Sequence, residues 1–220
     1  MTIHHHPSDE LLVDYAAGAL GEAWSLAIAT HLALCPSCRR ATAQMEAFGG
    51  IIIEAADVAP LVENSFDAVL ARLDEPFDEM QTATAVHQAS NGPPVVPQPL
   101  RRYVGADVGG LKWQRLGMGA CQLLIPTDED GVTARLLRIT AGRPVPEHSH
   151  GGLELTLVLT GAFADSTGTY GRGDLQEVDE TLQHQPHATP EEDCICLAVT
   201  DAPIRFKSLP ARLMQPFLGI

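Results

Sequence analysis

The feature that most constrains this chain is a His-x3-Cys-x2-Cys motif formed by His31, Cys35 and Cys38. In a helix that runs into a turn, His31 and Cys35 stand four residues apart and project from one face. Cys38 follows at the two-residue spacing that is common in zinc sites. Structural zinc takes four ligands, and the N-terminal run His4-His5-His6 can supply the fourth. The motif therefore predicts a zinc site.

The sequence around this motif has the pattern of four short amphipathic helices. We expect them at about residues 9–18, 22–34, 36–48 and 64–74. Ser8 is a typical N-cap for the first helix, and Gly49-Gly50 is expected to end the third. Helices of this length bury little apolar surface. A zinc ion is therefore expected to staple them together.

The composition changes after the fourth predicted helix. A sequence rich in Gln, Ala and Pro predicts a linker, assigned to residues 86–102, between a helical domain at 1–85 and a second domain at 103–220. Short apolar runs then alternate with Gly, Pro and Asp, at 121–125, 132–140, 153–159, 193–199 and 204–206. This pattern predicts a β sandwich or barrel. An apolar tail, residues 213–220, is expected to pack on that domain or on a partner.

A second group of metal-binding residue types lies within the predicted strands. His148, His150 and Glu154 share the parity of a strand, so their side chains can point to one side. His184 is expected to join them from a neighbouring strand. Three imidazoles and one carboxylate suit zinc, manganese, iron or nickel, so these ligand types do not select one metal.

Both patterns resemble known families. The spacing His6-x24-His31-x3-Cys35-x2-Cys38 resembles the zinc-binding anti-sigma domain of bacterial transcription regulators. The run Gly142-x5-His148-x-His150-x3-Glu154-x6-Gly161 is similar to the first cupin motif. In this order the two motifs resemble a ChrR-type anti-sigma factor. The resemblance implies a multidomain chain, with a small zinc-stapled helical bundle followed by an all-β cupin barrel.

The resemblance also implies a ligand set for each of two metals. The zinc ligands are His6, His31, Cys35 and Cys38, with His4 and His5 as rivals of His6. The ligands of a second divalent metal, zinc or manganese, iron or nickel, are His148, His150, Glu154 and His184. The usual Pro-x-Gly of the second cupin motif does not precede His184, which leaves His187 as a rival.

The function of the family follows from the resemblance as an expectation. Such proteins bind an extracytoplasmic-function-type sigma factor in the cytoplasm and keep it from core RNA polymerase. They release it in response to singlet oxygen or organic hydroperoxides, sensed through the cupin, and they are not enzymes. The alternative is a metal-dependent cupin enzyme, such as a dioxygenase, regulated by the zinc module. The sequence shows no second catalytic pair that would favour this alternative.

The charge of the chain bears on its partners. It has 14 basic and 28 acidic residues, a net charge of -14, which argues against direct binding to nucleic acid or to an anionic membrane. A basic protein partner would be attracted. No apolar run reaches the ~20 residues that span a bilayer, and five cysteines fit a reducing compartment, so we expect a cytoplasmic protein.

Two further groups are candidates for function. The fourth predicted helix carries an apolar stripe that either contacts the sigma factor or completes the helical core; it consists of Phe66, Val69, Leu70 and Leu73. Cys194 and Cys196 lie two apart on a predicted strand and share a face, which makes them redox candidates. The alternative is that both are buried thiols that act as small apolar side chains, and Cys121 has that role alone.

Overall fold

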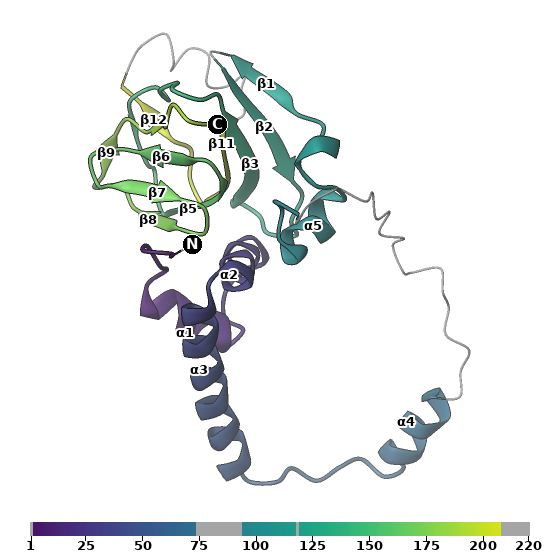
Figure 1. The fold of residues 1–220 in the computed structure, drawn as a ribbon. Coiled ribbons are helices and arrows are strands. Elements are labelled where there is room, and N and C mark those ends of the chain that lie inside the picture. The colour runs from purple at the N-terminus through teal and green to yellow at the C-terminus, as the bar shows by residue number, and fades with distance from the viewer. Residues whose placement is uncertain (1, 74–93, 118, 208–220) are drawn as a thin grey trace.

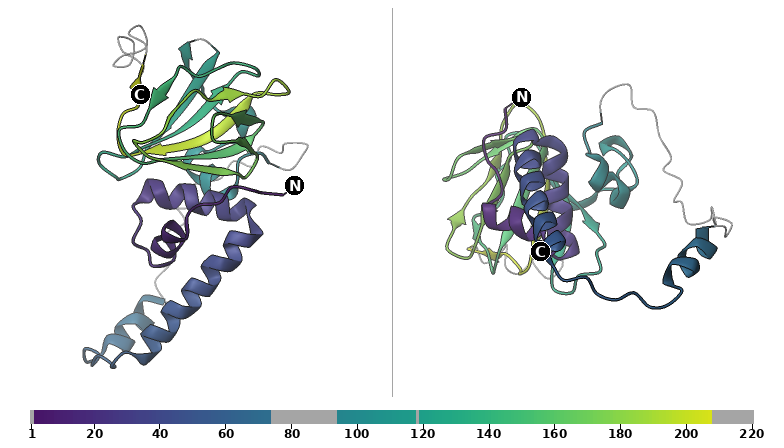
Figure 2. Two further views of the ribbon diagram at one scale, coloured as in Figure 1. Left: turned by 90° about the vertical axis from the view of Figure 1, so that its left-hand side faces the viewer. Right: turned by 90° about the horizontal axis from the view of Figure 1, so that it is seen from below.

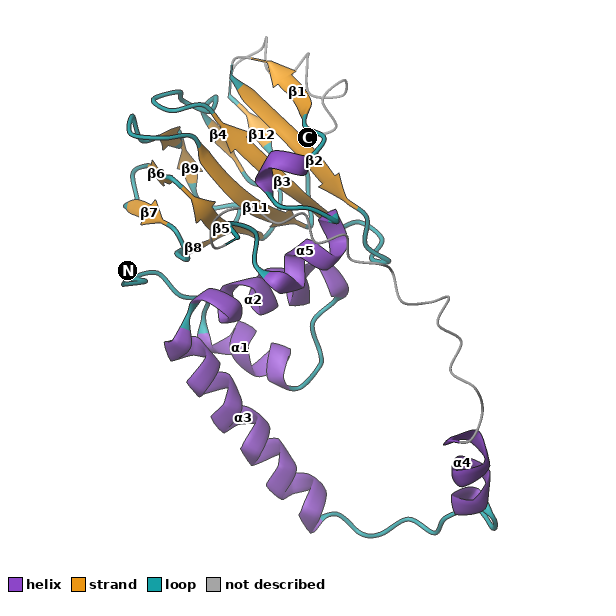
Figure 3. Cartoon of the chain, turned by 45° about the vertical axis from the view of Figure 1, so that its right-hand side comes forward, coloured by secondary structure: helices purple, strands orange, loops and turns teal. Residues whose placement is uncertain are grey.

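The computed structural model describes residues 2–73, 94–117 and 119–207. The N-terminal part is helical, with α1 (Asp9–Ala16), α2 (Glu22–Leu34), α3 (Pro36–Ala55) and α4 (Ser65–Leu73). Helix α5 (Gln98–Val104) and a short 3-10 helix, η2 (Val108–Gly110), precede the strands. Figures 1 and 3 show the helices below a strand-rich barrel, in the predicted order along the chain.

The signals that begin the first three helices differ in kind. Ser8 caps α1, since its hydroxyl accepts a hydrogen bond from the N–H of Leu11 at 3.4 Å. Cys35 caps α3, and Pro36 follows it at the first helical position. Gly21 precedes α2 without a side-chain cap of its own. The cap of α2 comes instead from Glu129 in the β region, as described below.

The end of α3 differs from the prediction. The helix does not stop at Gly49-Gly50 but continues to Ala55. Each glycine costs about 1 kcal/mol relative to alanine in a helix, which is too little to end a helix by itself. The extension bears exposed Ile51, Ile52 and Ile53, and Figure 2 shows it pointing away from the barrel.

Helix α4 lies apart from the other helices in Figures 1 and 3. None of its residues is buried. The exposed fractions of its apolar stripe are 69% for Phe66, 55% for Val69, 43% for Leu70 and 73% for Leu73. These side chains therefore do not complete the helical core in this structure, and that core is formed by α1, α2 and α3.

The β region contains twelve strands within the described residues. They are β1 (Gln114–Gly117), β2 (Ala120–Ile125), β3 (Thr133–Ile139), β4 (His148–Ser149), β5 (Glu154–Thr160), β6 (Ala162–Ala164), β7 (Thr169–Gly171), β8 (Leu175–Val178), β9 (Gln183–His184), β10 (His187–Ala188), β11 (Cys194–Thr200) and β12 (Arg205–Phe206). The main sheet has the order β1-β2-β3-β11-β5-β8, and two small sheets have the orders β10-β6-β7 and β12-β4-β9. All described pairs are antiparallel, as in a barrel of short strands.

The two faces of the main sheet bury different kinds of side chain. Successive residues of a strand point to opposite faces. One face packs on α2 and α5 and forms the larger core, which includes Ala27, Ile28, Leu100, Leu155, Leu157, Leu159, Leu197 and Val199. The other face points into the barrel and carries a smaller apolar cluster, which includes Ile139, Val158, Phe163, Tyr170, Ala188 and Cys194. The helices and the barrel therefore share one apolar core.

Helix α5 begins inside the predicted linker 86–102 and crosses its end. Pro97 precedes the helix, and Gly105 ends it in a left-handed conformation with φ of 73°. Leu100 is fully buried in the shared core. Residues 86–93 of the predicted linker and the apolar tail 213–220 lie outside the described residues. Within the described part of the chain, no helix is long and apolar enough to cross a membrane.

Candidate metal centres

The first cluster of metal-binding side chains joins the N-terminal segment to the start of α3. Its ligand atoms lie within 4.8 Å of one another and belong to His6, His31, Cys35 and Cys38. His6 Nδ1 is 3.5 Å from Cys35 Sγ and 3.2 Å from Cys38 Sγ. The structure therefore brings together the four residues that the sequence motif connected, and we name them the Cys/His cluster.

His31 is the most enclosed member of the Cys/His cluster. Its side chain is fully buried, and neither ring nitrogen has a hydrogen-bond partner among the described residues. Burial first, and the neighbouring His6 second, lower the pKa of His31 to about 4. An uncharged imidazole with free nitrogen atoms is the form that binds a metal.

The two thiols of the cluster are also buried. Burial first, and then Cys35, raise the pKa of the Cys38 thiol to about 12. A metal cation at this point would reverse that preference and favour the thiolates. Two sulfur and two imidazole donors form a set typical of structural zinc. The residues present therefore fit a zinc ion.

The segment that carries His6 is held by the barrel. The backbone N–H groups of His4 and His5 donate to Asp174 Oδ1 at 2.7 and 2.9 Å, and Leu175 N donates to His5 O at 3.1 Å. The rings of His5 and Tyr170 lie 4.3 Å apart. His5 thus contacts the barrel, while His6 faces the cysteines. Spacing along the chain gave no sign of these contacts, because they join residues about 170 positions apart.

The second cluster lies in the barrel and consists of His148, His150 and His184. All three are buried, and the Nε2 atoms of His150 and His184 are 3.0 Å apart. His148 Nδ1 donates to Pro146 O at 2.7 Å, which leaves its Nε2 available to a metal. We name this group the three-His cluster. Converging buried imidazoles fit a divalent metal but do not identify it.

Glu154 stands beside the three-His cluster rather than within it. Its Oε2 atom is 3.4 Å from His150 Nδ1, and its Oε1 atom accepts a hydrogen bond from Thr156 Oγ1 at 3.0 Å. Burial opposes its ionisation, but His150, His148 and Thr156 lower the pKa of Glu154 overall. It is therefore a carboxylate next to the cluster.

His187 is not part of the three-His cluster in the structure. It is exposed on β10, which pairs with β6, whereas His184 pairs with His148 across β9 and β4. His184 lies on β9, which pairs with β4, so it approaches the cluster from a neighbouring strand, as expected from the sequence.

Asp165 is a functional candidate that the sequence analysis missed. Its Oδ2 atom accepts a hydrogen bond from His184 Nδ1 at 2.6 Å, and both side chains are almost fully buried. Burial opposes ionisation, but hydrogen bonds from Thr167, Gln176 and His184 lower the pKa of Asp165 to about 2. Such an outer carboxylate fixes the orientation of a metal-binding imidazole. No spacing rule places residue 165 beside residue 184, so the sequence alone gave no signal.

Cys194 and Cys196 lie on β11 inside the barrel and are both buried. A hydrogen bond with Cys194 first, and burial second, raise the pKa of Cys196 well above its usual value. A thiol with a raised pKa reacts slowly, because the thiolate is the reactive form.

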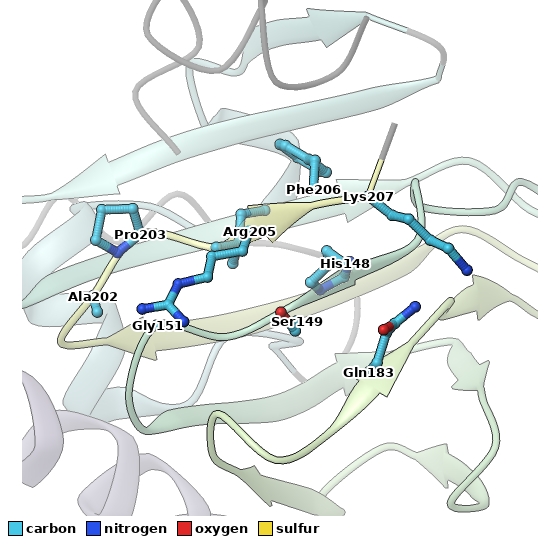
Figure 4. Close-up of a pocket in the computed structure, with 10 residues that line it drawn as sticks. His148, Ser149, Gly151, Gln183, Ala202, Pro203, Arg205, Phe206 and Lys207 are labelled. Atoms are coloured by element: carbon cyan, nitrogen blue, oxygen red, sulfur yellow. The ribbon is translucent and has the colours of Figure 1, made fainter. Parts of the chain in front are cut away.

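An open cavity of about 590 Å³ borders His148 from outside the cluster. Figure 4 shows Arg205 and Lys207 at its rim and His148 near its centre. Lys207 pairs with Glu147 at 2.9 Å. The remaining lining residues include Ser149, Gly151, Gln183, Ala202, Pro203, Ile204 and Phe206. A small molecule in this cavity would contact His148, and so would lie next to the three-His cluster.

Comparison with known proteins agrees with this geometry. Residues 102–203 match a family model described as the ChrR cupin-like domain. The whole chain is 46% identical, over 220 residues and all of the relative's length, to the anti-sigma-E factor ChrR of Cereibacter sphaeroides. This chain belongs to the ChrR family of anti-sigma factors. The resemblance stated from its two motifs is confirmed.

A solved ChrR structure supports the same assignment. The crystal structure of Rhodobacter sphaeroides SigE in complex with the anti-sigma ChrR matches with a TM-score of 0.79 and 45% identity, over 91% of this chain and 100% of that one. The predicted fold class, a helical N-terminal unit and a cupin, is thereby confirmed. A cupin of the RmlC type from Ralstonia eutropha is more distant, with 18% identity, 47% of this chain and 71% of that chain covered, and a TM-score of 0.41.

Proposed function

We propose that this ChrR-family protein binds an extracytoplasmic-function-type sigma factor and keeps it from RNA polymerase. The observation that carries the proposal is the 45% identity, over the full length of the solved chain, to a ChrR that was crystallised with the sigma factor SigE. The net charge of -14 would attract a basic protein surface. The proposal includes a cytoplasmic location, because sigma factors act on RNA polymerase there.

The proposed sigma-binding surface is the exposed apolar part of the helical region, within the domain assigned to residues 1–85. Phe66, Val69, Leu70 and Leu73 are exposed on α4, and Ile51 to Ile53 are exposed on α3. Groups of exposed apolar side chains, such as the one on each of these two helices, mark sites where proteins bind a partner. A helix with an exposed apolar stripe, such as α4, can bind in a groove between the helices of a sigma factor.

The Cys/His cluster is proposed to hold a structural zinc ion that fixes this surface. The zinc would join the N-terminal segment, the end of α2 and the start of α3, which carry its four ligands. When bound, zinc supplies a rigid tetrahedral junction between these elements. His6, His31, Cys35 and Cys38 would hold it.

The cupin, assigned to residues 103–220, is proposed to be the sensor of singlet oxygen or organic hydroperoxides, and not an enzyme. His148, His150 and His184, with Glu154 beside them, would hold a second divalent metal, zinc or manganese, iron or nickel. Cys194 and Cys196 stay redox candidates. The raised pKa of Cys196 disfavours its reactive thiolate form, so we propose the three-His cluster as the group on which an oxidant acts.

The proposal is tested by co-expressing the full chain with the extracytoplasmic-function-type sigma factors of its source genome. We expect a stoichiometric complex with one of them, and loss of that complex in the Cys38→Ser variant. Cys121→Ser is the matched control, since Cys121 lies outside both clusters. Failure of every sigma factor to co-purify with the zinc-loaded full chain would overturn the proposed function.

A further inference from the structure

A continuous series of side-chain contacts leads away from the three-His cluster. It begins at His184, whose Nδ1 atom donates to Asp165 Oδ2 at 2.6 Å. The other carboxylate oxygen of Asp165 accepts from the backbone N–H of Thr167 at 2.7 Å and from its hydroxyl at 2.6 Å. Gln176 Nε2 donates to Asp165 Oδ2 at 2.8 Å and to Thr167 Oγ1 at 2.9 Å. These bonds fix the turn 165–167 against the back of His184.

The series continues from Thr167 to Tyr170. Their hydroxyl oxygens are 2.9 Å apart. Because the Thr167 hydroxyl donates its hydrogen to Asp165, it accepts here, and the Tyr170 hydroxyl donates. The ring of Tyr170 stacks on Phe163 with centroids 4.9 Å apart and an interplanar angle of 15°. It also contacts the ring of His5, at 4.3 Å. Tyr170 therefore lies between the barrel interior and the N-terminal segment.

The series ends at the Cys/His cluster. His5 is covalently joined to His6, whose Nδ1 atom is 3.2 Å from Cys38 Sγ. The turn after β7 holds this segment closely. A Cβ atom on Gly173 would lie 2.6 Å from the side chain of Ile3 and 3.7 Å from that of Leu34, the last residue of α2. The turn thus touches both the segment before His6 and the helix that carries His31.

We propose that Asp165, Thr167 and Tyr170 are positioning residues that couple the three-His cluster to the Cys/His cluster. When a metal binds the three-His cluster, His184 is fixed by that metal on one side and by Asp165 on the other. The orientation of Asp165 is passed through Thr167 to the Tyr170 hydroxyl, and the Tyr170 ring sets the position of His5. The position of His6 relative to the two cysteines then depends on the state of the barrel. This inference rests on the proposed function, since it names how the sensor region would act on the sigma-binding region.

The coupling acts in both directions, because the effect of one binding site on another is reciprocal. Removing an outer partner of a metal-binding histidine typically changes metal affinity by about 10- to 100-fold. Coupling between two sites in one protein is typically about 5- to 150-fold in affinity. The apolar core between α2 and the main sheet is a second physical connection. The hydroxyl of Tyr170 does not belong to that core. Deleting it therefore breaks the hydrogen-bonded series and leaves the apolar connection in place.

The test uses the full chain without a sigma factor. Cobalt(II) replaces zinc in the Cys/His cluster, where thiolate-to-cobalt charge-transfer absorption reports this site alone, since the three-His cluster has no sulfur ligand. Cobalt affinity is measured by competition with a chelator, once with zinc in the three-His cluster and once in a His148→Ala background that blocks that cluster. We expect the two affinities to differ by at least ~5-fold in the otherwise unchanged chain.

The matched variants are Tyr170→Phe and Tyr103→Phe. Each loses one hydroxyl from a side-chain hydrogen bond. Tyr170 contacts Thr167 at 2.9 Å within the barrel, and Tyr103 donates to Glu22 at 2.8 Å between α5 and α2. We expect Tyr170→Phe to reduce the difference to less than ~2-fold and Tyr103→Phe to retain it. Asp165→Asn should abolish the difference and also weaken metal binding at the three-His cluster by about 10- to 100-fold.

Two results would overturn the inference: no difference in the unchanged chain, or an undiminished difference in Tyr170→Phe. A chain that binds its sigma factor but gives either result would overturn this coupling alone. A chain that shows the coupling but binds no sigma factor would overturn the proposed function and leave the coupling intact.

Discussion

The two clusters of metal-binding side chains differ in donors and in construction. The Cys/His cluster combines two thiols and two imidazoles, and three of its members lie within eight consecutive residues. The three-His cluster has nitrogen donors alone, from β4, from the residue that follows it and from β9, with the carboxylates of Glu154 and Asp165 against its rings. A locally encoded, sulfur-rich set suits a structural metal, whereas imidazoles backed by carboxylates suit a metal whose properties are tuned. We therefore propose a stabilising role for the first cluster and a sensing role for the second.

We expect the largest effect from the removal of one ligand of the Cys/His cluster, which tests its structural role. In Cys38→Ser we expect loss of its zinc and a lower free energy of unfolding of the helical region, because the free energy of binding structural zinc is on the order of 10 kcal/mol and supports folding directly. Sigma affinity should fall by more than ~100-fold, or about 2.7 kcal/mol. Zinc analysis and a binding titration measure both effects, with Cys121→Ser as control. A Cys38→Ser variant that keeps both its zinc and its sigma affinity would contradict a structural role for the Cys/His cluster.

The acid sensitivity of the zinc-free chain tests how strongly the Cys/His cluster keeps His31 buried and uncharged. Its pKa is about 4 in the folded chain and about 6.5 when exposed, so between these values the unfolded chain binds more protons. The free energy of unfolding should therefore fall as the pH is lowered from about 6.5 to about 4, by on the order of 3 kcal/mol in total. Chemical denaturation at several pH values measures this. His31→Leu should flatten the pH dependence of the free energy of unfolding. If that dependence is unchanged in His31→Leu, it arises from another titratable group.

The exposed stripe of α4 tests where the sigma factor binds. Leu70→Asp should reduce sigma affinity by ~30-fold, about 2 kcal/mol, if the stripe supplies central apolar contacts. Its melting temperature should stay the same, because Leu70 is not buried in the free chain. Leu124→Asp is the matched control, an exposed leucine on β2 of the barrel. Equal losses in both variants would argue against a specific role for α4.

The cap of α2 offers the smallest effect, at the junction between the two regions. Glu129 Oε2 accepts a hydrogen bond from Ala23 N at 2.9 Å, so a residue of the β region caps a helix of the N-terminal helical region. Glu129→Ala should cost about 1 kcal/mol, a decrease of ~2–4 °C in melting temperature. Glu180→Ala, an exposed carboxylate after β8, is the control. Equal melting temperatures for the two variants would show that the cap does not stabilise the junction.

The sequence predicted what depends on local spacing. The i, i+4 relation of His31 and Cys35, the cysteine pair and the shared parity of His148 and His150 all placed side chains that the structure brings together. The sequence could not predict contacts between distant segments. Asp165 behind His184, and Asp174 under the N-terminal segment, depend on how strands pair and on how the helices dock. The end of α3 was missed for a different reason, because two glycines weaken a helix without ending it.

The most direct test of the account measures sigma affinity before and after treatment with an organic hydroperoxide, in the unchanged full chain and in His148→Ala. With zinc in excess, so that the Cys/His cluster stays occupied in both chains, we predict equal affinities within ~3-fold before treatment. After treatment we predict a loss of at least ~10-fold in the unchanged chain and none in His148→Ala. His187→Ala, the exposed histidine on β10, should behave like the unchanged chain. Undiminished release from His148→Ala would contradict a sensing role for the three-His cluster.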